Sequence, residues 1–386
     1  MQRKILSVAA AVIFAVTATV TVYAESAKKL CYLENTDKSG IGVSAVSAIL
    51  IEADTGTVLF SKNEKEHRQI ASTTKIMTAL LTLEAGEPDK EFEVDPTAIK
   101  VEGTSMGLRE GDIVTRRALC YGMLLPSGND AANAAAVNIS GSKSAFAVLM
   151  NKRAEEIGMT DTNFVTPSGL DADGQYSCAY DLALLTREAM NNKDFAKICG
   201  LPKAKVSFGN PKSDRILVNS NKLLTSYDGC IGVKTGFTDS ARRTLVSCAE
   251  RDGVRLIAVT LNAPNDWSDH AKMLDYGFEK VTLCEMKYDS SALSLSVVGS
   301  DKETVGVECG AVKLPLCNEQ KDKITAEIYM PKGLAAGEKV GEIHYLLNGN
   351  TIATAPLQTA ESCVQKERKT DFFTVIYKFI AGLLTR

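Results

Sequence analysis

The feature that most constrains the fold is a pair of strand-rich segments flanking a long helix-rich region. Residues 43–62 carry two β-rich runs about a turn at residues 54–56, which predicts a β-hairpin. A second hairpin is predicted over residues 244–261, about a turn at residues 251–253, and a strand at residues 229–235 precedes it. We expect these distant strands to form one antiparallel sheet that joins both ends of the region.

The helix-rich region has apolar residues at helical spacing. Helices are predicted at residues 73–84, 115–124, 130–139, 143–157 and 180–191, with another after the second hairpin at residues 267–278. Because the helices are grouped rather than alternating with single strands, we predict an α+β fold with a helical lobe over the sheet. We expect this first domain to span residues 25–284.

A second domain is predicted over residues 285–365. Short alternating segments occur there, separated by turn residues, at residues 292–298, 304–307, 324–329 and 343–347. This pattern is typical of a small all-β domain.

The composition excludes several classes of protein. The chain has 386 residues, of which 45% are hydrophobic and 24% are charged, the balance of an ordinary folded protein. These values exclude a disordered, collagen-like or multi-spanning membrane chain. The formal net charge of −3 provides no basic footprint for nucleic acid, so we expect no nucleic-acid partner.

Residues 1–24 have the pattern of a secretory signal peptide. Arg3 and Lys4 precede a mostly apolar run that ends near Val20, and the segment ends on Ala24. A basic start, a short apolar run and small residues are typical of a cleaved export signal. The alternative is an N-terminal membrane anchor, although the run is short for a span. We predict that the protein is exported.

Residues 366–386 predict an amphipathic helix. Basic residues are followed by an apolar stripe at Phe372, Phe373, Ile376, Phe379, Ile380, Leu383 and Leu384. The stripe is too short to span a membrane but suits its interface, so we expect anchoring at the outer face of the cytoplasmic membrane. The alternative is a helix packed on the protein's own surface.

The ten cysteines have no spacing typical of a metal or redox site. The closest pair, Cys309 and Cys317, is eight residues apart. Several lie in apolar segments, such as Cys248, where a thiol behaves as a small buried hydrophobic group. We expect mostly structural thiols, no metal and no cofactor.

Three short motifs occur in order along the chain, and they are Ser72-x-x-Lys75, Ser127-x-Asn129 and Lys234-Thr235-Gly236. The first lies where a helix is predicted to begin, so Ser72 and Lys75 share one helical face. The helix N-terminus favours negative charge developing beside Ser72, and Lys75 is placed to be the base that a serine nucleophile requires. The ordered set predicts a serine enzyme.

Each motif also has a structural explanation when taken alone. Ser72 fits a helix N-cap, Ser127 a loop, and Lys75 and Lys234 solvated lysines. The Ser-x-x-Lys pattern also occurs at residues 140–143, where the other motifs do not follow in comparable settings. The prediction therefore depends on the three motifs together.

A competing serine motif, Gly-x-Ser-x-Gly, occurs at residues 103–107. In α/β-hydrolases this motif follows an apolar strand and precedes a helix. Here the flanking residues predict a turn, and the triad would require His270 in a polar stretch. We therefore expect Ser105 not to be the nucleophile.

With these motifs, the chain resembles the low-molecular-mass penicillin-binding proteins, which are serine D-alanyl-D-alanine carboxypeptidases. The similarity covers most of the mature chain, including residues 48–56, 127–133, 168–177, 179–183, 221–224 and 232–238. The resemblance implies a β-lactamase/transpeptidase-like fold followed by a β-rich domain and an amphipathic C-terminus.

The resemblance also implies catalytic roles. Ser72 attacks the carbonyl between the last two D-alanines of a peptidoglycan stem peptide, and Lys75 accepts its proton. Ser127, with Asn129 nearby, relays a proton towards the departing D-alanine. Water then hydrolyses the acyl-enzyme. A β-lactam mimics the terminal dipeptide and acylates Ser72 too.

The implied substrate-binding residues are Lys234, Thr235, Gly236 and Phe237. Lys234 and Thr235 bind the terminal carboxylate, and the N–H groups of Ser72 and Phe237 form the oxyanion hole. A lysine base requires a lowered pKa, which burial and the charge of Lys234 supply.

The chain departs from the family pattern shortly after Lys-Thr-Gly. Members often have Ala-Gly there, whereas this chain has Ala241, Arg242 and Arg243, so bulk and charge replace a glycine. The alternative functions are a β-lactamase or an endopeptidase of the same superfamily, or a non-catalytic wall-binding protein. A β-lactamase needs an added carboxylate to activate water, and no such glutamate motif lies between Ser127 and Lys234.

Overall fold

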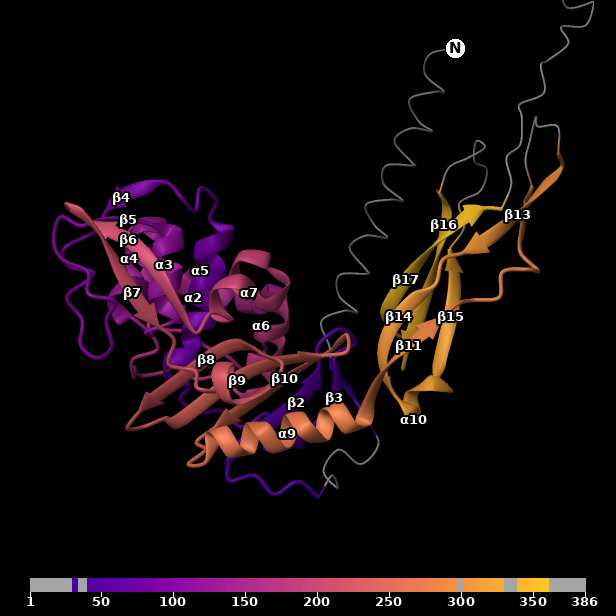
Figure 1. The fold of residues 1–386 in the computed structure, drawn as a ribbon, viewed down its shortest axis with the longest axis horizontal. Helices are drawn as coiled ribbons and strands as arrows, with labels where there is room; N and C mark the ends of the chain where they lie inside the picture. The colour runs from indigo at the N-terminus through magenta and orange to yellow at the C-terminus, as the bar shows by residue number, and fades with distance from the viewer. Residues whose placement is uncertain (1–29, 34–39, 297–301, 330–338, 361–386) are drawn as a thin grey trace, which may run out of the picture. The chain divides into compact units, whose positions relative to one another are not determined.

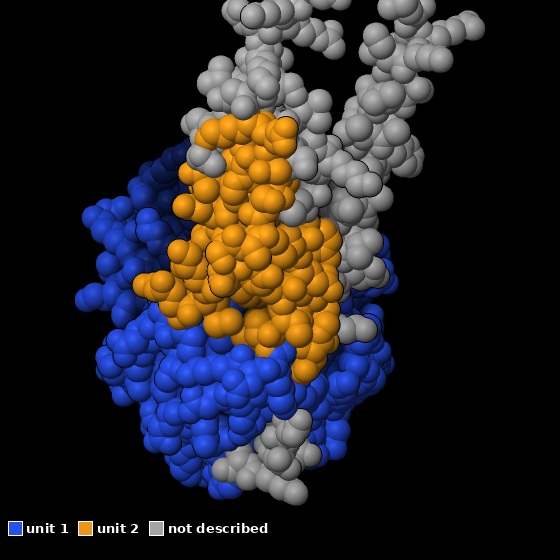
Figure 2. All heavy atoms as spheres, turned by 90° about the vertical axis from the view of Figure 1, so that its right-hand side faces the viewer, with its two compact units in different colours: residues 1–284, 314–323 blue, residues 285–313, 324–386 orange. Residues whose placement is uncertain are grey.

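The computed structural model describes residues 30–33, 40–296, 302–329 and 339–360 (Figure 1). The predicted signal peptide at residues 1–24 and the predicted helix at residues 366–386 lie outside the described residues. The chain divides into two compact units, which are residues 1–284 with 314–323 and residues 285–313 with 324–386 (Figure 2).

The first unit is built on a six-stranded sheet with the spatial order β1-β3-β2-β10-β9-β8. The strands are β1 (Cys31–Tyr32), β2 (Ser47–Glu52), β3 (Thr57–Lys62), β8 (Cys230–Thr238), β9 (Arg242–Arg251) and β10 (Val254–Leu261). β2 lies between β3 and β10 and is antiparallel to both, whereas β1 is parallel to β3. Strands from both ends of the region therefore share one sheet, which confirms the predicted α+β fold.

Both faces of this sheet are buried. On β2, Ile49 and Ile51 belong to the core shared with the helical lobe, whereas Ala48 and Leu50 belong to the core under α9 (Asp266–Lys280). Successive side chains of a strand point to opposite faces, so a strand covered on both sides is apolar throughout. This explains the continuous apolar run in β2.

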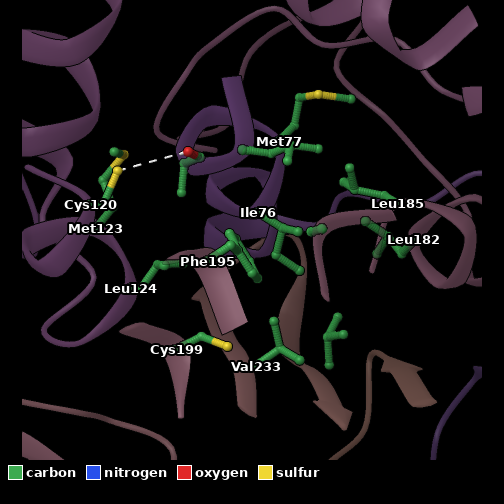
Figure 3. Packing of buried hydrophobic residues seen from close by; sticks show 14 of the residues in the cluster. Ile76, Met77, Cys120, Met123, Leu124, Leu182, Leu185, Phe195, Cys199 and Val233 are labelled. Carbon is green, nitrogen blue, oxygen red and sulfur yellow. Dashed lines mark hydrogen bonds between the residues drawn. The ribbon is translucent and has the colours of Figure 1, made fainter. Parts of the chain in front are cut away.

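The helical lobe covers the face of the sheet opposite α9 (Figure 1). Its helices are α2 (Lys75–Glu84), α3 (Arg116–Leu124), α4 (Asn129–Ser140), α5 (Lys143–Ile157), α6 (Ala179–Asn191), α7 (Lys193–Cys199) and α8 (Leu223–Ser226). Nearly every residue of α2 is buried, as expected for a helix surrounded by others. Figure 3 shows Ile76 and Met77 of α2 among side chains from the neighbouring elements. The helix α2 therefore lies at the centre of the lobe, where packing on all sides sets its position.

The predicted helices are present, but the first begins differently. Residues 71–74 form a 3₁₀ turn, and the α-helix starts at Lys75. Sequence patterns also missed α7, α8 and four short pairings. These are β4 (Glu91–Glu93) with β5 (Ile113–Thr115), β6 (Lys203–Gly209) with β7 (Lys212–Val218), and isolated bridges between Arg68 and Ser177 and between Asn163 and Tyr176.

The second unit is rich in strands, as predicted. Its five-stranded sheet has the order β12-β13-β17-β16-β15. The strands are β12 (Ser294–Ser296), β13 (Thr304–Cys309), β15 (Ile324–Tyr329), β16 (Lys339–Leu347) and β17 (Asn350–Thr359). A separate pair is formed by β11 (Val281–Met286) and β14 (Val312–Cys317), and the short helix α10 (Asn318–Lys321) follows β14. Most of this pair and all of α10 belong to the first unit.

Two further properties bear on the sequence predictions. The nine cysteines within the described residues are free thiols, and seven of them are buried. Within the same residues, no helix combines the length and apolar character needed to cross a membrane.

Candidate active site

Ser72 lies in a tight turn at the entrance to α2. The preceding residue, Ala71, has a φ of +48°, a left-handed conformation that is uncommon for a residue with a side chain. Ser72 does not cap the helix: no side-chain cap closes either the 3₁₀ turn or α2. Its Oγ instead accepts a hydrogen bond from Lys75 Nζ at 2.7 Å. The turn therefore directs Ser72 to Lys75.

Lys75 is buried and held by three oxygen atoms. Besides Ser72 Oγ, its Nζ donates to Asn129 Oδ1 at 2.7 Å and to the carbonyl of Ser168 at 2.6 Å. The side chain of Asn129 is oriented in turn, since its Nδ2 donates to the carbonyl of Glu102 at 2.7 Å. Three segments far apart in sequence thus converge on one amine.

The environment of Lys75 favours its neutral form. Burial is the largest cause that lowers the pKa of the Lys75 amine well below its usual value, and the positive charge of Lys234 lowers it further. The carboxylate of Asp130 acts in the opposite direction but is the smallest of these causes. An amine with a lowered pKa can accept a proton near neutral pH, as a general base must.

The second motif lies at the start of α4. Ser127 has a φ of +70° and Gly128 is the N-cap residue, so the chain turns sharply before Asn129 opens the helix. Ser127 lines the same cavity as Ser72, and its carbonyl accepts a hydrogen bond from Thr104. In the described residues the direct partner of Lys75 from this motif is Asn129 rather than Ser127.

The third motif occupies β8 at the edge of the sheet. Lys234 is buried, and its Nζ donates to the carbonyl of Thr235 at 2.8 Å. Burial lowers the pKa of the Lys234 amine to about 7. Thr235, Gly236 and Phe237 line the cavity, and the hydroxyl of Thr235 is hydrogen-bonded to that of Ser220 at 2.7 Å.

Two glycines allow the backbone to approach Ser72 closely. A Cβ added to Gly169, which has a φ of +81°, would lie 2.0 Å from the carbonyl oxygen of Ala71. One added to Gly236 would lie 2.3 Å from Thr244 Oγ1 and 3.0 Å from the backbone nitrogen of Ser72. Only glycine permits these approaches without a shift of the turn that carries Ser72.

These residues surround a cavity of about 450 Å³ that brings the three motifs together. Its wall also contains residues outside the three motifs, among them Leu170, Ser220, Lys222, Arg243, Asp266 and Trp267. The sequence held a signal for three of these residues: Leu170 and Lys222 lie in segments that carry the family resemblance, and Arg243 stands where the chain departs from the family's Ala-Gly. Asp266 and Trp267 had none, because they follow β10 and belong to a helix predicted only for its apolar face.

The competing motif at residues 103–107 does not form a nucleophile elbow. Ser105 Oγ donates to Asp130 Oδ2 at 2.5 Å, and backbone N–H groups of the same loop donate to this carboxylate. His270 is buried between Ser247 and Thr260 and contacts their hydroxyls. Ser105 therefore ties a loop to α4, and the segment is not the strand-turn-helix of a nucleophile elbow, in keeping with the turn that its sequence context predicted.

Comparison with known proteins agrees with this geometry. Residues 34–265 match the family model described as D-alanyl-D-alanine carboxypeptidase, and residues 278–365 match the C-terminal domain of penicillin-binding protein 5. The chain is 32% identical to the D-alanyl-D-alanine carboxypeptidase DacF of Bacillus subtilis (strain 168), over 88% of this chain and 90% of DacF. It is also 32% identical to DacC of Escherichia coli (strain K12), over 88% of each chain.

A solved structure has the same architecture. Penicillin-binding protein 5 from Haemophilus influenzae superposes with a TM-score of 0.64 at 26% identity, covering 84% of this chain and 99% of that one. The family model alone matches more than half of the chain, and the matched region contains all three motifs. The chain therefore belongs to the D-alanyl-D-alanine carboxypeptidase family, the serine enzymes known as low-molecular-mass penicillin-binding proteins.

Proposed function

We propose that this enzyme removes the terminal D-alanine from peptidoglycan stem peptides through an acyl-enzyme on Ser72. The observation that carries the proposal is the set of three contacts to Lys75 Nζ. A neutral amine has two N–H groups and one lone pair. In the structure Nζ donates all three contacts, as the charged amine does. When the amine is neutral, the acceptors of Asn129 and Ser168 take both N–H groups, so the contact with Ser72 reverses and its hydroxyl donates to the lone pair.

In the acylation step, Ser72 Oγ forms a bond with the carbonyl carbon between the two D-alanines. Its proton passes to the Lys75 amine, and the carbonyl oxygen becomes an oxyanion. The N–H groups of Ser72 and Phe237 are the proposed donors to this oxyanion. The close approach of Gly236 to Ser72 N supports the proposal, because it brings β8 beside the nucleophile.

Collapse of the intermediate breaks the peptide bond, and the departing D-alanine nitrogen needs a proton. Lys75 holds the proton taken from Ser72, and Ser127 at the cavity wall is the proposed relay to that nitrogen. Water then attacks the ester carbonyl, and Lys75 accepts its proton. As the ester bond breaks, Lys75 returns that proton to Ser72 Oγ, and the shortened peptide leaves.

The alternatives have less support. A β-lactamase needs a carboxylate that activates the deacylating water, but Asp266 is the only carboxylate among the described residues that line the cavity, and it is bound to Arg243. A non-catalytic wall-binding protein would not need a buried lysine beside a serine. Cleavage of cross-links, an endopeptidase reaction, uses the same acyl-enzyme and is distinguished by its substrate.

We also propose that the enzyme is exported and held at the outer face of the cytoplasmic membrane. The support comes from the sequence patterns at residues 1–24 and 366–386. A chain that ends at Gln365 should be released without detergent, whereas the full chain should remain with vesicles of anionic lipid. Release of both forms alike would contradict the anchor.

Labelling with a fluorescent penicillin tests the nucleophile. Ser72→Ala should abolish the label and the release of D-alanine from a pentapeptide, and Ser105→Ala, in the other serine motif, should retain both. A label that survives in Ser72→Ala would contradict the assignment. Labelling of the wild type without D-alanine release would favour the β-lactamase alternative, which hydrolysis of the free penicillin would then reveal.

A further inference from the structure

The cavity contains a fixed cation that none of the three motifs supplies. Arg243 of β9 lines the cavity, and its side chain is 42% exposed. Its register partner across the sheet is Phe237 of β8, two residues from Thr235. Residues directly opposite on antiparallel strands have neighbouring side chains. Arg243 is therefore placed beside the β8 residues proposed to bind substrate.

We propose that Arg243, held by Asp266 and Trp267, binds the terminal carboxylate of the substrate and sets the preference for a free C-terminus. This inference rests on the proposed function and identifies which cation of this chain performs the recognition. It also accounts for the arginine that stands near the family's usual Ala-Gly position.

The guanidinium is held in one orientation by two neighbours. Nε and Nη2 of Arg243 donate to Asp266 Oδ1 at 3.0 and 2.9 Å, and the guanidinium carbon lies 5.6 Å from the centre of the Trp267 ring. Asp266 is almost completely buried, so its carboxylate is held in place and fixes the orientation of the Arg243 side chain. Within the described residues, Nη1 has no hydrogen-bond acceptor and is left for a ligand.

Two lysines, Lys234 and Lys222, are less suited than Arg243 to bind the terminal carboxylate. Lys234 is 1% exposed, it does not line the cavity, and its Nζ is bound to the carbonyl of Thr235. Lys222 lines the cavity but is an exposed, flexible point charge. A preorganised guanidinium loses less entropy when it binds a carboxylate and matches its planar shape. The hydroxyls of Thr235 and Ser220 line the same cavity as further donors.

The test uses one peptide in two forms, an acylated Lys-D-Ala-D-Ala acid and its C-terminal amide. Both peptides present the same scissile bond, and only the acid carries the negatively charged carboxylate that Arg243 would bind. In the full-length enzyme, Arg243→Gln should lower kcat/KM for the acid by roughly 10- to 100-fold and leave the amide nearly unchanged. Arg243→Lys should restore part of the preference.

The adjacent Arg242 provides the matched control. It is exposed and absent from the cavity wall, so Arg242→Gln should keep the preference of the wild type. Because Arg243→Gln leaves the buried Asp266 without its partner, the double variant with Asp266→Asn removes both charges and guards against misfolding. Lys222→Gln should keep most of the preference.

Binding can be measured without turnover, because Trp267 is the only tryptophan of the chain and lines the cavity. In a Ser72→Ala background, its fluorescence should report tighter binding of the acid than of the amide, and Arg243→Gln should remove the difference.

Three results would overturn the inference: an unchanged acid-to-amide ratio in Arg243→Gln, an equal loss on both peptides, or a preference that disappears in Lys222→Gln instead. A wild type that releases no D-alanine from the acid would contradict the proposed function, while the fluorescence titration would still test Arg243.

Discussion

Asn129 Oδ1 lies 2.7 Å from Lys75 Nζ, and this contact joins the start of α4 to the start of α2. The hydrogen bond from Asn129 Nδ2 to the carbonyl of Glu102 fixes which end of the amide faces the amine. The contact therefore places a neutral acceptor, not a charge, beside the proposed base.

Asn129→Asp should move the acid limb of the pH profile to higher pH. A carboxylate at this position stabilises the ammonium form of Lys75, so the pKa of the amine rises and the base is available only at higher pH. Near neutral pH we expect kcat/KM for D-alanine release to fall at least 10-fold, with partial recovery in alkaline buffer. The measurement is kcat/KM against pH for both enzymes.

Asn138→Asp is the matched control, because it makes the same change on the same helix. Asn138 contacts Arg116 and not Lys75, so its pH profile should match that of the wild type. Coincident profiles for Asn129→Asp and the wild type would contradict a lysine base at this position.

Gly169→Ala should slow acylation by displacing the turn before Ser72. The new Cβ would meet the carbonyl oxygen of Ala71, a backbone atom that moves only with the turn. Gly174→Ala is the control, because Gly174 also has a left-handed φ, of +80°, yet its nearest neighbour would be 3.7 Å away. Both variants should lose about 1–2 kcal/mol of stability from the left-handed conformation.

The rate of penicillin acylation separates the two variants. Gly174→Ala should react like the wild type, and Gly169→Ala should react at least 10-fold more slowly at the same fraction folded. Equal rates would mean that the turn tolerates the displacement.

Much of the fold was predictable because its elements are long and strongly patterned. The hairpins about residues 54–56 and 251–253 and the helices α2 to α6 of the lobe appear where periodicity placed them. The β6–β7 hairpin was missed, although apolar Val206 and Phe208 alternate with polar residues before a turn at Gly209. The signal was present but short, and such segments are the least certain to interpret.

The site was predictable only where a motif lies within a few residues. Ser72 and Lys75 are joined by local helical geometry, so their contact follows from spacing alone. The carbonyl of Ser168 is a backbone group and carries no sequence signal, yet it contacts Lys75. Asp266 meets Arg243 because α9 begins where β10 ends beside β9, which is a property of the tertiary fold.

The stability and the labelling rate of the protein should not depend on disulfide bonds. Since the nine described cysteines are free, reductant should leave the melting temperature and the penicillin-labelling rate unchanged. Native alkylation followed by peptide mapping should label Cys230 and Cys284, which are partly exposed, before buried thiols such as Cys120 and Cys248. A large drop in melting temperature with reductant would contradict this prediction.

His270 should make the protein sensitive to acid. Burial lowers the pKa of this imidazole from 6.5 to about 3, and its ring contacts the hydroxyls of Ser247 and Thr260. Between these two pH values the unfolded chain binds a proton that the folded protein excludes. The stabilisation is therefore fully present above pH 6.5 and is lost as the pH falls, at about 1.4 kcal/mol per pH unit.

His270→Gln removes this proton uptake while keeping an amide that can hydrogen-bond the two hydroxyls. Urea unfolding from pH 7 to pH 4 should show a shallower loss of stability in the variant, by nearly one proton. His67→Gln is the comparison variant, because it makes the same replacement at a histidine whose side chain is 50% exposed rather than buried. Parallel curves for the wild type and His270→Gln would show that other groups determine the acid response.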